Sequence, residues 1–336
     1  MLRVAVVGAT GYTALEVIKL LLRHPEVRLT VATSRQAGSP PLASVHPSLA
    51  ARTDLQLEDL GPIAVADRAD AVLCCLPHGV VTEWAPQLLA AGRKVVDFSA
   101  DYRLHDAEVY KQWYGLTHGD PERLGKVAYG LPELFREQIR GAQMVANPGC
   151  YPTTAILALA PLLKAGLIEP HGLIIDSKSG VSGAGREPKL TTHFPECNES
   201  LSAYNVGRHR HMPEIEQVLR VASGQDIGLI FTPHLIPMDR GILTTAYSLP
   251  RGNVSEEQAF TALREFYANE PFVRVVDHLP GTKDSVDTNF CDITVRRVRD
   301  RLITVSCIDN LIKGAAGAAV QNLNLMCGFA ETTALR

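Results

Sequence analysis

The sequence predicts an α/β protein with two domains. The first is built on a doubly wound parallel sheet, and the second is an α+β domain with a mixed or antiparallel sheet. Three observations support this prediction. The chain has 336 residues, which suits two domains of roughly 150 residues each. Its first third alternates apolar strands with helices. After about Pro148 the pattern changes to segments that are typical of a mixed or antiparallel sheet.

The predicted elements of the first domain begin with a strand at Val4–Val7. This is a continuous apolar run of the kind that a parallel sheet buries on both faces. A helix follows over Ala14–Leu22, where apolar residues recur at helical spacing, and His24-Pro25 ends it. Further strands are expected at Val27–Ala32, Ala71–Leu76 and Lys94–Phe98. In such a βαβ alternation, ligands bind outside the carboxyl ends of the strands.

The second domain is predicted from four apolar strands and one well-marked helix. The strands are expected at Leu173–Asp176, Ile227–Phe231, Ile242–Tyr247 and Leu302–Ser306. The helix covers Ser255–Tyr267, with Ser255 as its N-cap and two glutamates in its first turn. The small residues of Gly314–Val320 start a terminal helix that we expect to pack on the first domain. The predicted domains are therefore residues 1–148 with 313–336 and residues 149–312.

The composition excludes several classes of protein. A formal net charge of −3 gives no basic surface for nucleic acid or acidic membranes. No apolar run reaches the length of about 18 to 20 residues that a membrane-spanning helix needs, and Met1 leads directly into the first strand without a signal peptide. The seven cysteines are odd in number and scattered, with neither a disulfide framework nor zinc spacing. We therefore expect a cytoplasmic protein without a structural metal.

A glycine-rich turn follows the first strand and opens the first helix. Gly8 permits a tight turn, and Gly11 lets backbone N–H groups approach a pyrophosphate at the positive end of the helix. This context favours a Rossmann-type dinucleotide site over an ordinary βα turn. The residues expected to line it are Gly8, Thr10, Gly11, Tyr12 and Thr13, together with Pro77 after a later strand.

The end of the second strand indicates which dinucleotide binds. An acidic residue at this point would bind a ribose 2′-hydroxyl, but the sequence has Ser34 and Arg35. A hydroxyl and a guanidinium suit a 2′-phosphate, so the sequence predicts NADP rather than NAD. The alternative is that Arg35 is only a solvated surface charge.

Cys150 follows a Pro-Gly turn and precedes a helical run predicted over Thr154–Leu163. A thiol near a helix N-terminus has a lowered pKa, because the aligned N–H groups stabilise the thiolate. Alongside a nucleotide-binding turn, this position favours a nucleophile over a buried structural cysteine. His209 and His211 are candidate bases, since alternate residues of an extended segment point to the same side.

Other polar segments are candidates for binding anions. Arg208 and Arg210 suit a carboxylate or phosphate, although a solvated basic patch is the alternative, and Glu214 is placed to orient a histidine. The segment Ser177–Arg186 is expected to form a glycine-serine loop that binds an anion or the nicotinamide ribose, or else a plain flexible loop. A strand end at residues 97–103 presents Ser99 and Arg103 to a phosphate.

Together these segments resemble the N-acetyl-gamma-glutamyl-phosphate reductases, a family within the aspartate-semialdehyde dehydrogenase superfamily. The matching pieces are GATGYTALEV, LPHGV, DFSADYRL, YGLPEL, NPGCYPTT, SKSGVSGAGR, HRHMPEI, FTPHLIPMDRGI and DNLIKGAAGAAVQN. NPGCYPTT and HRHMPEI are specific to this family. Ala14 departs from its usual third glycine, but alanine is accepted where a helix packs on a strand.

The resemblance implies roles for individual residues. Cys150 would be the nucleophile, His209 the acid/base with His211 as the second candidate, and Arg103 a phosphate ligand. Ser179 and Gly180 would line the nicotinamide side, while Asn310 and Lys313 would approach the cofactor. Members of this superfamily are usually dimers or tetramers, so a homo-oligomer is expected.

The reaction implied belongs to arginine biosynthesis. NADPH would reduce the acyl phosphate N-acetyl-glutamyl 5-phosphate to N-acetyl-glutamate 5-semialdehyde, with release of phosphate, through a thioester and a thiohemiacetal on the cysteine. Arg208 or Arg210 would hold the substrate α-carboxylate. The alternatives are an aspartate-semialdehyde dehydrogenase, a reductase of N-acetyl-aminoadipyl phosphate, a cysteine hydrolase, and a non-catalytic NADP-sensing or scaffold protein.

Overall fold

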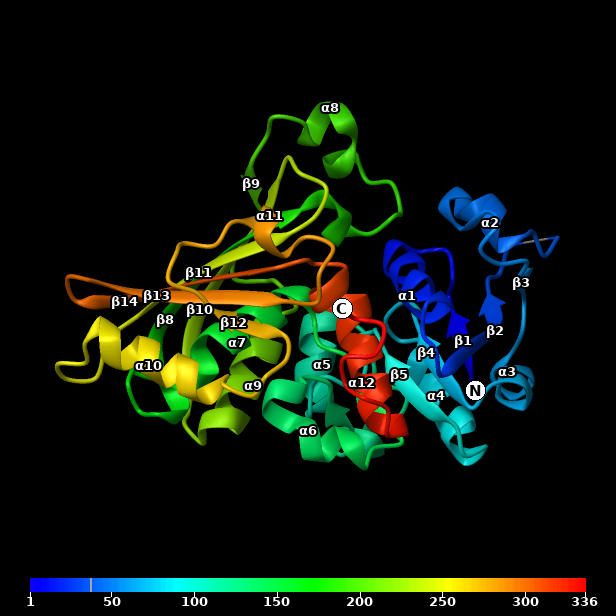
Figure 1. Cartoon of the computed structure of the whole chain (residues 1–336), viewed down its shortest axis with the longest axis horizontal. Coiled ribbons are helices and arrows are strands. Elements are labelled where there is room, and N and C mark those ends of the chain that lie inside the picture. Colours follow the sequence, from blue (N-terminus) through cyan, green and yellow to red (C-terminus); the bar gives the residue numbers. More distant parts are fainter. Residues whose placement is uncertain (37) are drawn as a thin grey trace. The chain divides into compact units, whose positions relative to one another are not determined.

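The computed structural model describes residues 1–36 and 38–336, which form two compact units (Figure 1). The first unit contains Met1–Pro148 and Ala315–Arg336, and the second contains Gly149–Gly314. The chain therefore leaves the first unit once and returns to it near the C-terminus. The return lies at Ala315, whereas the sequence analysis placed it at residue 313.

The first unit contains a seven-stranded sheet in which every pair of neighbouring strands is parallel. The strand order is β3-β2-β1-β4-β5-β7-β6. The strands are β1 (Leu2–Val7), β2 (Val27–Thr33), β3 (Leu57–Glu58), β4 (Ala71–Cys74), β5 (Lys94–Asp97), β6 (Ala128–Tyr129) and β7 (Met144–Ala146). The order reverses at β1, as in a doubly wound sheet, and the apolar run of β1 is buried as its sequence predicts.

The helices of this unit lie between its strands in the chain, except the terminal one, which follows the second unit. They are α1 (Tyr12–Leu22), α2 (Leu42–Val45), α3 (Pro62–Arg68), α4 (Val81–Ala90), α5 (Ala107–Tyr114), α6 (Pro132–Arg140) and the terminal α12 (Gly317–Cys327), with short 3₁₀ turns η1 (Pro47–Leu49) and η2 (Pro121–Arg123). The terminal helix α12 packs against α1 and α6, so residues from both ends of the chain share one core. Its small residues Ala318 and Ala319 are buried there, which explains their size.

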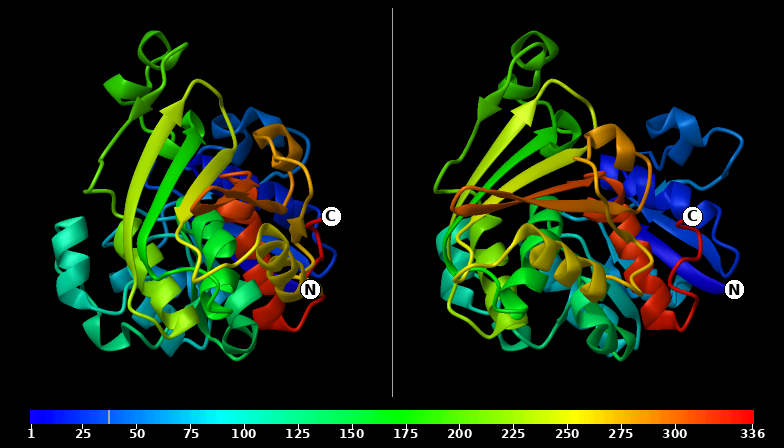
Figure 2. Two further views of the ribbon diagram at one scale, coloured as in Figure 1. Left: turned by 90° about the vertical axis from the view of Figure 1, so that its left-hand side faces the viewer. Right: turned by 60° about the vertical axis from the view of Figure 1, so that its left-hand side comes forward.

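The second unit contains a mixed sheet with the order β12-β13-β14-β11-β8-β10-β9. Its strands are β8 (His171–Gly180), β9 (Ser202–Ala203), β10 (Gly228–Ile236), β11 (Ile242–Ser248), β12 (Val273–Val275), β13 (Cys291–Val298) and β14 (Arg301–Ile308). The pairs β8–β10 and β12–β13 are parallel and the other neighbours are antiparallel. Figure 2 shows β8, β10 and β11 as long adjacent arrows.

Three long helices lie against one face of this second sheet: α7 (Cys150–Lys164), α9 (Met212–Ser223) and α10 (Glu256–Phe266) (Figure 1). Ser255 caps α10: its side chain accepts a hydrogen bond from the Gln258 backbone N–H, and the Gln258 side-chain oxygen accepts the Ser255 backbone N–H, as in a capping box. The shorter elements are α8 (Phe194–Cys197), α11 (Thr282–Ser285), the 3₁₀ turns η3 (Val181–Ala184) and η4 (Leu190–Thr192), and a π-helical turn, η5 (Ile312–Ala316).

The predicted fold class is confirmed, but three local expectations differ from the structure. Ser177–Gly180 belongs to β8 rather than to a loop, because β10 and β11 pair with it as far as Gly180 and Ser179 respectively. The helix after the Pro-Gly turn begins at Cys150, not at Thr154. The strand β13 had no counterpart among the expected elements, and it completes an antiparallel hairpin with β14.

Three further observations concern the whole described chain. Within residues 1–36 and 38–336, no helix combines the length and apolar character needed to cross a membrane. All seven cysteines are free thiols. The described residues also contain no cluster of three or more potential metal ligands.

Candidate active site

The glycine turn of the first unit connects β1 to α1. Gly8 has φ +78°, and a Cβ atom there would lie 2.4 Å from the carbonyl oxygen of Cys75, so only glycine fits. Gly11 is the N-cap of α1 and has open space where a side chain would be. Thr10, Tyr12 and Thr13 flank this opening, and the first N–H groups of α1 have no helical partner. The turn thus has room for an anionic group at a helix N-terminus.

A buried histidine that the sequence analysis missed supports this turn. His46 donates a hydrogen bond from Nε2 to the carbonyl of Ala9 over 2.8 Å. The backbone of Gly8 also donates to the Thr33 hydroxyl at the end of β2. A single histidine between apolar residues has no local motif, so only the tertiary fold identifies its role.

Ser34 and Arg35 lie directly after β2, as expected. Ser34 is half-buried and Arg35 is exposed. The nearest strand end, on β3, carries Glu58, whose carboxylate is bound by both terminal nitrogens of Arg68 at 2.7 and 2.8 Å. Hydrogen bonding to this guanidinium lowers the pKa of Glu58. The carboxylate on this edge is therefore already paired within the protein.

A buried polar network fixes the loop that carries Pro77. The Asp101 carboxylate accepts hydrogen bonds from the backbone N–H groups of Gly79 (2.7 Å) and Val81 (3.2 Å) at the start of α4. Pro77 itself is exposed. Nearby, burial raises the pKa of Asp97 to about 7, with the negative charge of Asp101 adding to the shift.

Arg103 lies in the same network and is almost fully buried. Its Nε donates to the carbonyl of Asn147 and its Nη2 to the carbonyl of Phe98, both over 2.8 Å. These bonds hold the guanidinium at the carboxyl ends of β5 and β7, since Asn147 directly follows β7. Asn147 is also three residues before Cys150 in the chain.

Cys150 is the first residue of α7, a helix of 15 residues. The preceding Gly149 donates its backbone N–H to the Glu214 carboxylate over 2.8 Å. Glu214 is 1% exposed and lies in the first turn of α9, so its side chain joins the N-termini of the two helices. Glu214 thus binds the N-terminus of the helix that carries Cys150. The sequence analysis had expected it to orient a histidine.

The π-helical turn η5 contacts the cysteine directly. Its defining bond runs from the Gly314 N–H to the carbonyl of Asp309 over 2.9 Å. A Cβ atom at Gly314 would lie 2.9 Å from the Cβ of Cys150 and 3.3 Å from its Cα. Glycine is thus required at this position, and π-helical turns often mark functional sites.

His209 is enclosed by four rings of the second unit. Its ring centroid lies 5.5 Å from that of Tyr151, 5.3 Å from Tyr204, 4.8 Å from His211 and 5.3 Å from Phe231. Burial lowers the pKa of His209 to about 4, and the positive charge of Arg210 contributes. The Nδ1 atom accepts the N–H of His211 over 3.2 Å. The neutral ring therefore carries its proton on Nε2.

The segment Arg208–His211 forms a turn and not the extended stretch that the alternation argument assumed. His211 has the helical angles φ −80° and ψ −13° and is the N-cap of α9. The two histidine rings nevertheless meet through the turn. Both Arg208 and Arg210 are exposed.

The remaining candidates lie around the end of β8. A Cβ atom at Gly180 would lie 2.4 Å from the carbonyl oxygen of Asp239, and the Ser179 hydroxyl donates to the Gly180 carbonyl. The Asn310 side chain accepts the N–H of Gly241 over 2.7 Å and donates to the Ser182 hydroxyl over 3.0 Å. Lys313 is fully buried, with its ammonium 5.8 Å from the centroid of Phe272.

The sequence analysis missed two groups that organise this unit. Tyr204 donates a hydrogen bond to the Tyr151 hydroxyl over 3.1 Å, and Tyr151 donates to the carbonyl of His234 over 3.0 Å. Asp309, fully buried, pairs with Arg240 and accepts the backbone N–H groups that begin the π turn. Tyr151 is next to the cysteine and Asp309 lies in a matched motif. Their partners are distant in the sequence, so the local pattern around each residue does not identify them.

The depressed pKa of His209 has a testable consequence. We expect its ring resonances to titrate with a midpoint near 4 in an NMR experiment, with the signal assigned by comparison with His209→Gln. Between pH 6.5 and 4 the unfolded chain then binds a proton at this residue that the folded chain does not. This residue therefore contributes a loss of stability as the pH falls through that range. A midpoint near 6.5 would contradict the enclosed geometry.

Comparison with known proteins places the chain among related sequences. The family model described as "Semialdehyde dehydrogenase, NAD binding domain" matches residues 3–142, and "Semialdehyde dehydrogenase, dimerisation domain" matches residues 150–310. The N-acetyl-gamma-glutamyl-phosphate reductase of Rhodopirellula baltica is 56% identical over 339 residues, which cover 99% of this chain and 98% of the relative. That of Citrifermentans bemidjiense is 50% identical over 100% of this chain and 98% of the relative.

Solved structures agree with the fold. Aspartate semialdehyde dehydrogenase II of Vibrio cholerae matches with a TM-score of 0.74 and 16% identity over 98% of both chains. The aspartate semialdehyde dehydrogenase of Candida albicans matches with a TM-score of 0.74 and 16% identity over 97% of this chain and 98% of the other. At such identities the likeness concerns the fold.

Proposed function

Since the chain belongs to the N-acetyl-gamma-glutamyl-phosphate reductases of the semialdehyde dehydrogenase family, we propose that it reduces N-acetyl-glutamyl 5-phosphate to N-acetyl-glutamate 5-semialdehyde and releases phosphate. The observation that carries this proposal is the place of Cys150 at the first position of α7. A thiol there lies at the positive end of 15 aligned peptide dipoles, which favour the thiolate.

The covalent steps follow from this thiolate. The Cys150 sulfur attacks the acyl carbon, the carbon–oxygen bond to phosphate breaks, and a thioester remains on the enzyme. When bound, the reduced nicotinamide supplies the hydride that converts this thioester to a thiohemiacetal. The carbon–sulfur bond then breaks, the aldehyde leaves, and the thiolate is restored.

We propose His209 as the acid/base group at the thiohemiacetal oxygen, with His211 as the second candidate. The neutral His209 ring presents Nε2–H, because its Nδ1 is occupied by the backbone of His211. Its Nε2–H would donate a hydrogen bond to the developing oxyanion and stay on the ring. The oxyanion then collapses to the aldehyde as the carbon–sulfur bond breaks, so no proton is gained or lost. The Tyr151 ring, next to the nucleophile in the chain, lies 5.5 Å from His209 and supports this assignment.

We propose substrate-binding roles for three arginines. In the first unit, Arg103 would bind the phosphoryl group, which suits a guanidinium already held by two carbonyls. In the second, Arg208 or Arg210 would bind the α-carboxylate, since both are exposed. Glu214 would keep the first turn of α7 in place. The division into a nucleotide-binding first unit and a catalytic second unit follows from these assignments.

We propose NADP as the dinucleotide. The glycine turn at Gly8 and Gly11 accepts a pyrophosphate, with Thr10, Tyr12, Thr13 and Pro77 around it. The 2′-phosphate would lie at Ser34 and Arg35, where the nearby Glu58 is neutralised by Arg68. Ser179, Gly180, Asn310 and Lys313 are proposed to support the nicotinamide side. For Asn310 and Lys313 this support acts through the backbone they hold, since the Asn310 amide is bonded within the second unit and Lys313 is buried there.

Removing the guanidinium of Arg35 should therefore weaken NADPH selectively. For Arg35→Gln we expect the KM for NADPH to rise about tenfold, the effect of losing one charge-assisted contact to a phosphate, with the KM for NADH unchanged. Arg28→Gln, which removes another exposed arginine from the opposite end of β2, is the matched control. An unchanged KM for NADPH would assign Arg35 to the solvated surface, and an equal rise for both cofactors would contradict contact with the 2′-phosphate.

We also propose that the protein is a cytoplasmic homo-oligomer. The face of the second sheet opposite α7, α9 and α10 exposes apolar side chains, including Ile174 (42% exposed) and Ile230 (58% exposed). The matching family model for this unit is described as a dimerisation domain. Seven free thiols suit a reducing compartment. Sedimentation of the wild type against Ile230→Asp tests the association.

The reaction is best tested in reverse. The enzyme receives N-acetyl-glutamate 5-semialdehyde, phosphate and NADP⁺, and NADPH formation is followed by absorbance. Phosphate-dependent formation with this substrate, and little with aspartate semialdehyde or the one-carbon-longer N-acetyl-aminoadipate semialdehyde, supports the proposal. Preferential turnover of either control assigns the chain to the corresponding sister activity. Hydrolysis of an ester without cofactor would indicate a cysteine hydrolase, and no turnover of any substrate would favour a non-catalytic protein.

A further inference from the structure

A large pocket lies in the first unit, away from the glycine turn. Its volume is about 1070 Å³, at the upper end of the range for small-molecule sites. Its wall includes Ala128 and Met144, the first residues of β6 and β7, so it opens at the amino ends of the strands. The glycine turn lies at the carboxyl end of β1. The proposed reaction therefore does not use this pocket.

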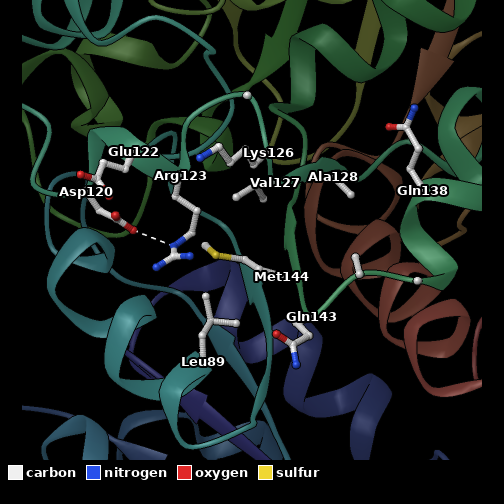
Figure 3. Close-up of a pocket in the computed structure, with 13 residues that line it drawn as sticks. Leu89, Asp120, Glu122, Arg123, Lys126, Val127, Ala128, Gln138, Gln143 and Met144 are labelled. Carbon is white, nitrogen blue, oxygen red and sulfur yellow. Dashed lines mark hydrogen bonds and ion pairs between the residues drawn. The ribbon is translucent and has the colours of Figure 1, made fainter.

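The charged groups of the pocket come from the segment before β6. Figure 3 shows Arg123 and Lys126 projecting into it, with Asp120 and Glu122 close by. Arg123 is oriented by Asp120, which accepts its Nε–H over 2.8 Å. The backbone of Lys126 donates to the Arg123 carbonyl, which keeps the two cations on one turn. In the described part of the chain, the terminal nitrogens of Arg123 form no hydrogen bond.

The two carboxylates in this pocket differ in whether they already accept hydrogen bonds from the protein. Asp120 already accepts the Nε–H of Arg123 and the hydroxyl of Tyr102, each over 2.8 Å. Glu122 is exposed, and its carboxylate has no partner among the described residues. The site thus offers a preoriented guanidinium to a carboxylate and a separate carboxylate to an ammonium group. A phosphate would meet the repulsion of Glu122, whereas a zwitterion satisfies both charges.

The rest of the pocket suits a side chain of moderate size. Leu89, Val127 and Met144 form an apolar part, and the amides of Gln138 and Gln143 line the remainder (Figure 3). We propose that the pocket binds a free amino acid, with its α-carboxylate on Arg123 and its α-ammonium on Glu122, and that this binding changes the affinity of the enzyme for its acyl phosphate.

The second part of the proposal rests on a short chain of contacts. Tyr102 is buried, its hydroxyl bonds to Asp120, and it directly precedes Arg103 in the sequence. A second tie joins the same segments, since His118 donates to the carbonyl of Asp101 over 2.6 Å and accepts the N–H of Asp120. A ligand that binds Arg123 therefore changes the hydrogen bond of Arg123 to Asp120. Through Asp120 and Tyr102, that change reaches the backbone that carries Arg103. This coupling relies on the proposed role of Arg103 in binding phosphate, whereas ligand binding does not.

The test measures binding and turnover separately on the full-length enzyme. Melting temperature and the KM for the acyl phosphate are recorded with millimolar L-leucine, L-glutamine, L-glutamate or L-arginine. N-acetyl-L-leucine and N-acetyl-L-glutamine test the need for the ammonium group, while acetate and inorganic phosphate test binding of any anion. The variants are Glu122→Gln, which leaves the Arg123–Asp120–Tyr102 contacts intact, and Arg123→Gln. Glu26→Gln, an exposed glutamate outside the pocket, is the matched control.

We expect at least one free amino acid to raise the melting temperature and to shift the KM. Glu122→Gln and Arg123→Gln should each weaken that ligand about tenfold or more, with kcat in its absence unchanged, and Glu26→Gln should behave as wild type. The proposal is overturned if no amino acid raises the melting temperature, if acetate or phosphate acts equally well, or if the effect survives Glu122→Gln. A melting shift without any change in KM would overturn the coupling. Because the melting shift needs no turnover, its outcome is independent of the proposed reaction.

Discussion

Cys150→Ser should reduce phosphate-dependent NADPH formation about 10⁴-fold or more, because removing a covalent nucleophile leaves only binding and electrostatic stabilisation. A serine at the start of α7 has the same neighbours, but its hydroxyl is not ionised near neutral pH. The melting temperature should stay close to that of the wild type. The measurement is the reverse assay at saturating aldehyde and NADP⁺, with phosphate present and absent.

Two controls separate loss of the nucleophile from general damage. Cys327→Ser, at a half-buried thiol whose pKa is raised to about 11 by burial, should keep full activity. In the wild type, aldehyde and NADP⁺ without phosphate should leave an acyl group on the peptide that contains Cys150, detectable by mass spectrometry. Activity in Cys150→Ser within tenfold of the wild type would exclude a thioester at this residue.

Gly314→Ala should have the second largest effect, a fall in kcat of about a hundredfold, the usual result of moving a reacting atom by about 1 Å. The added methyl group would lie 2.9 Å from the Cβ of Cys150 and 3.3 Å from both its Cα and the Asp309 carbonyl oxygen. None of these atoms ends a flexible side chain, so either the π turn or the first turn of α7 must shift. Initial rates and the KM for each substrate will show whether kcat carries the loss.

Gly61→Ala is the matched control for this substitution. Gly61 precedes α3, has a negative φ, and has open space where a methyl group would be added. We expect Gly61→Ala to retain wild-type kcat and stability. An unchanged kcat in Gly314→Ala, with the protein folded, would show that the contact between the π turn and Cys150 does not determine the position of the sulfur.

Much of the fold could be predicted because its signals are local. The apolar run of Val4–Val7, the two glycines after it and the N-cap Ser255 each depend on residues within one turn or strand. Their structures are β1, the turn into α1, and a capping box at the start of α10. The family membership was also evident from short motifs distributed along the chain, and the relatives confirm it.

What the sequence did not show depends on contacts between distant residues. The strand β8 continues through Gly180 because β10 and β11 extend its hydrogen bonding, although Ser-Gly-rich sequence is typical of a loop. The bond of Glu214 to Gly149 and the pairing of Asp309 with Arg240 each join residues more than sixty positions apart. Local patterns carry no information on such partners, and the same holds for the pocket at Arg123. The roles of the site residues themselves are still predictions.

The contact between Gly314 and Cys150 brings together the two ends of the second unit, which is inserted into the first unit in the sequence. Its first residue, Gly149, and its last, Gly314, both lie at this contact, so the entry and exit points are neighbours. Segments whose ends meet are the ones that tolerate domain exchange and circular permutation. Residues 149–314 are therefore a suitable segment for chimeric proteins. Inserted into the first unit of a related protein, this segment would carry Cys150, His209 and Glu214 together. The nucleotide preference would stay with the recipient.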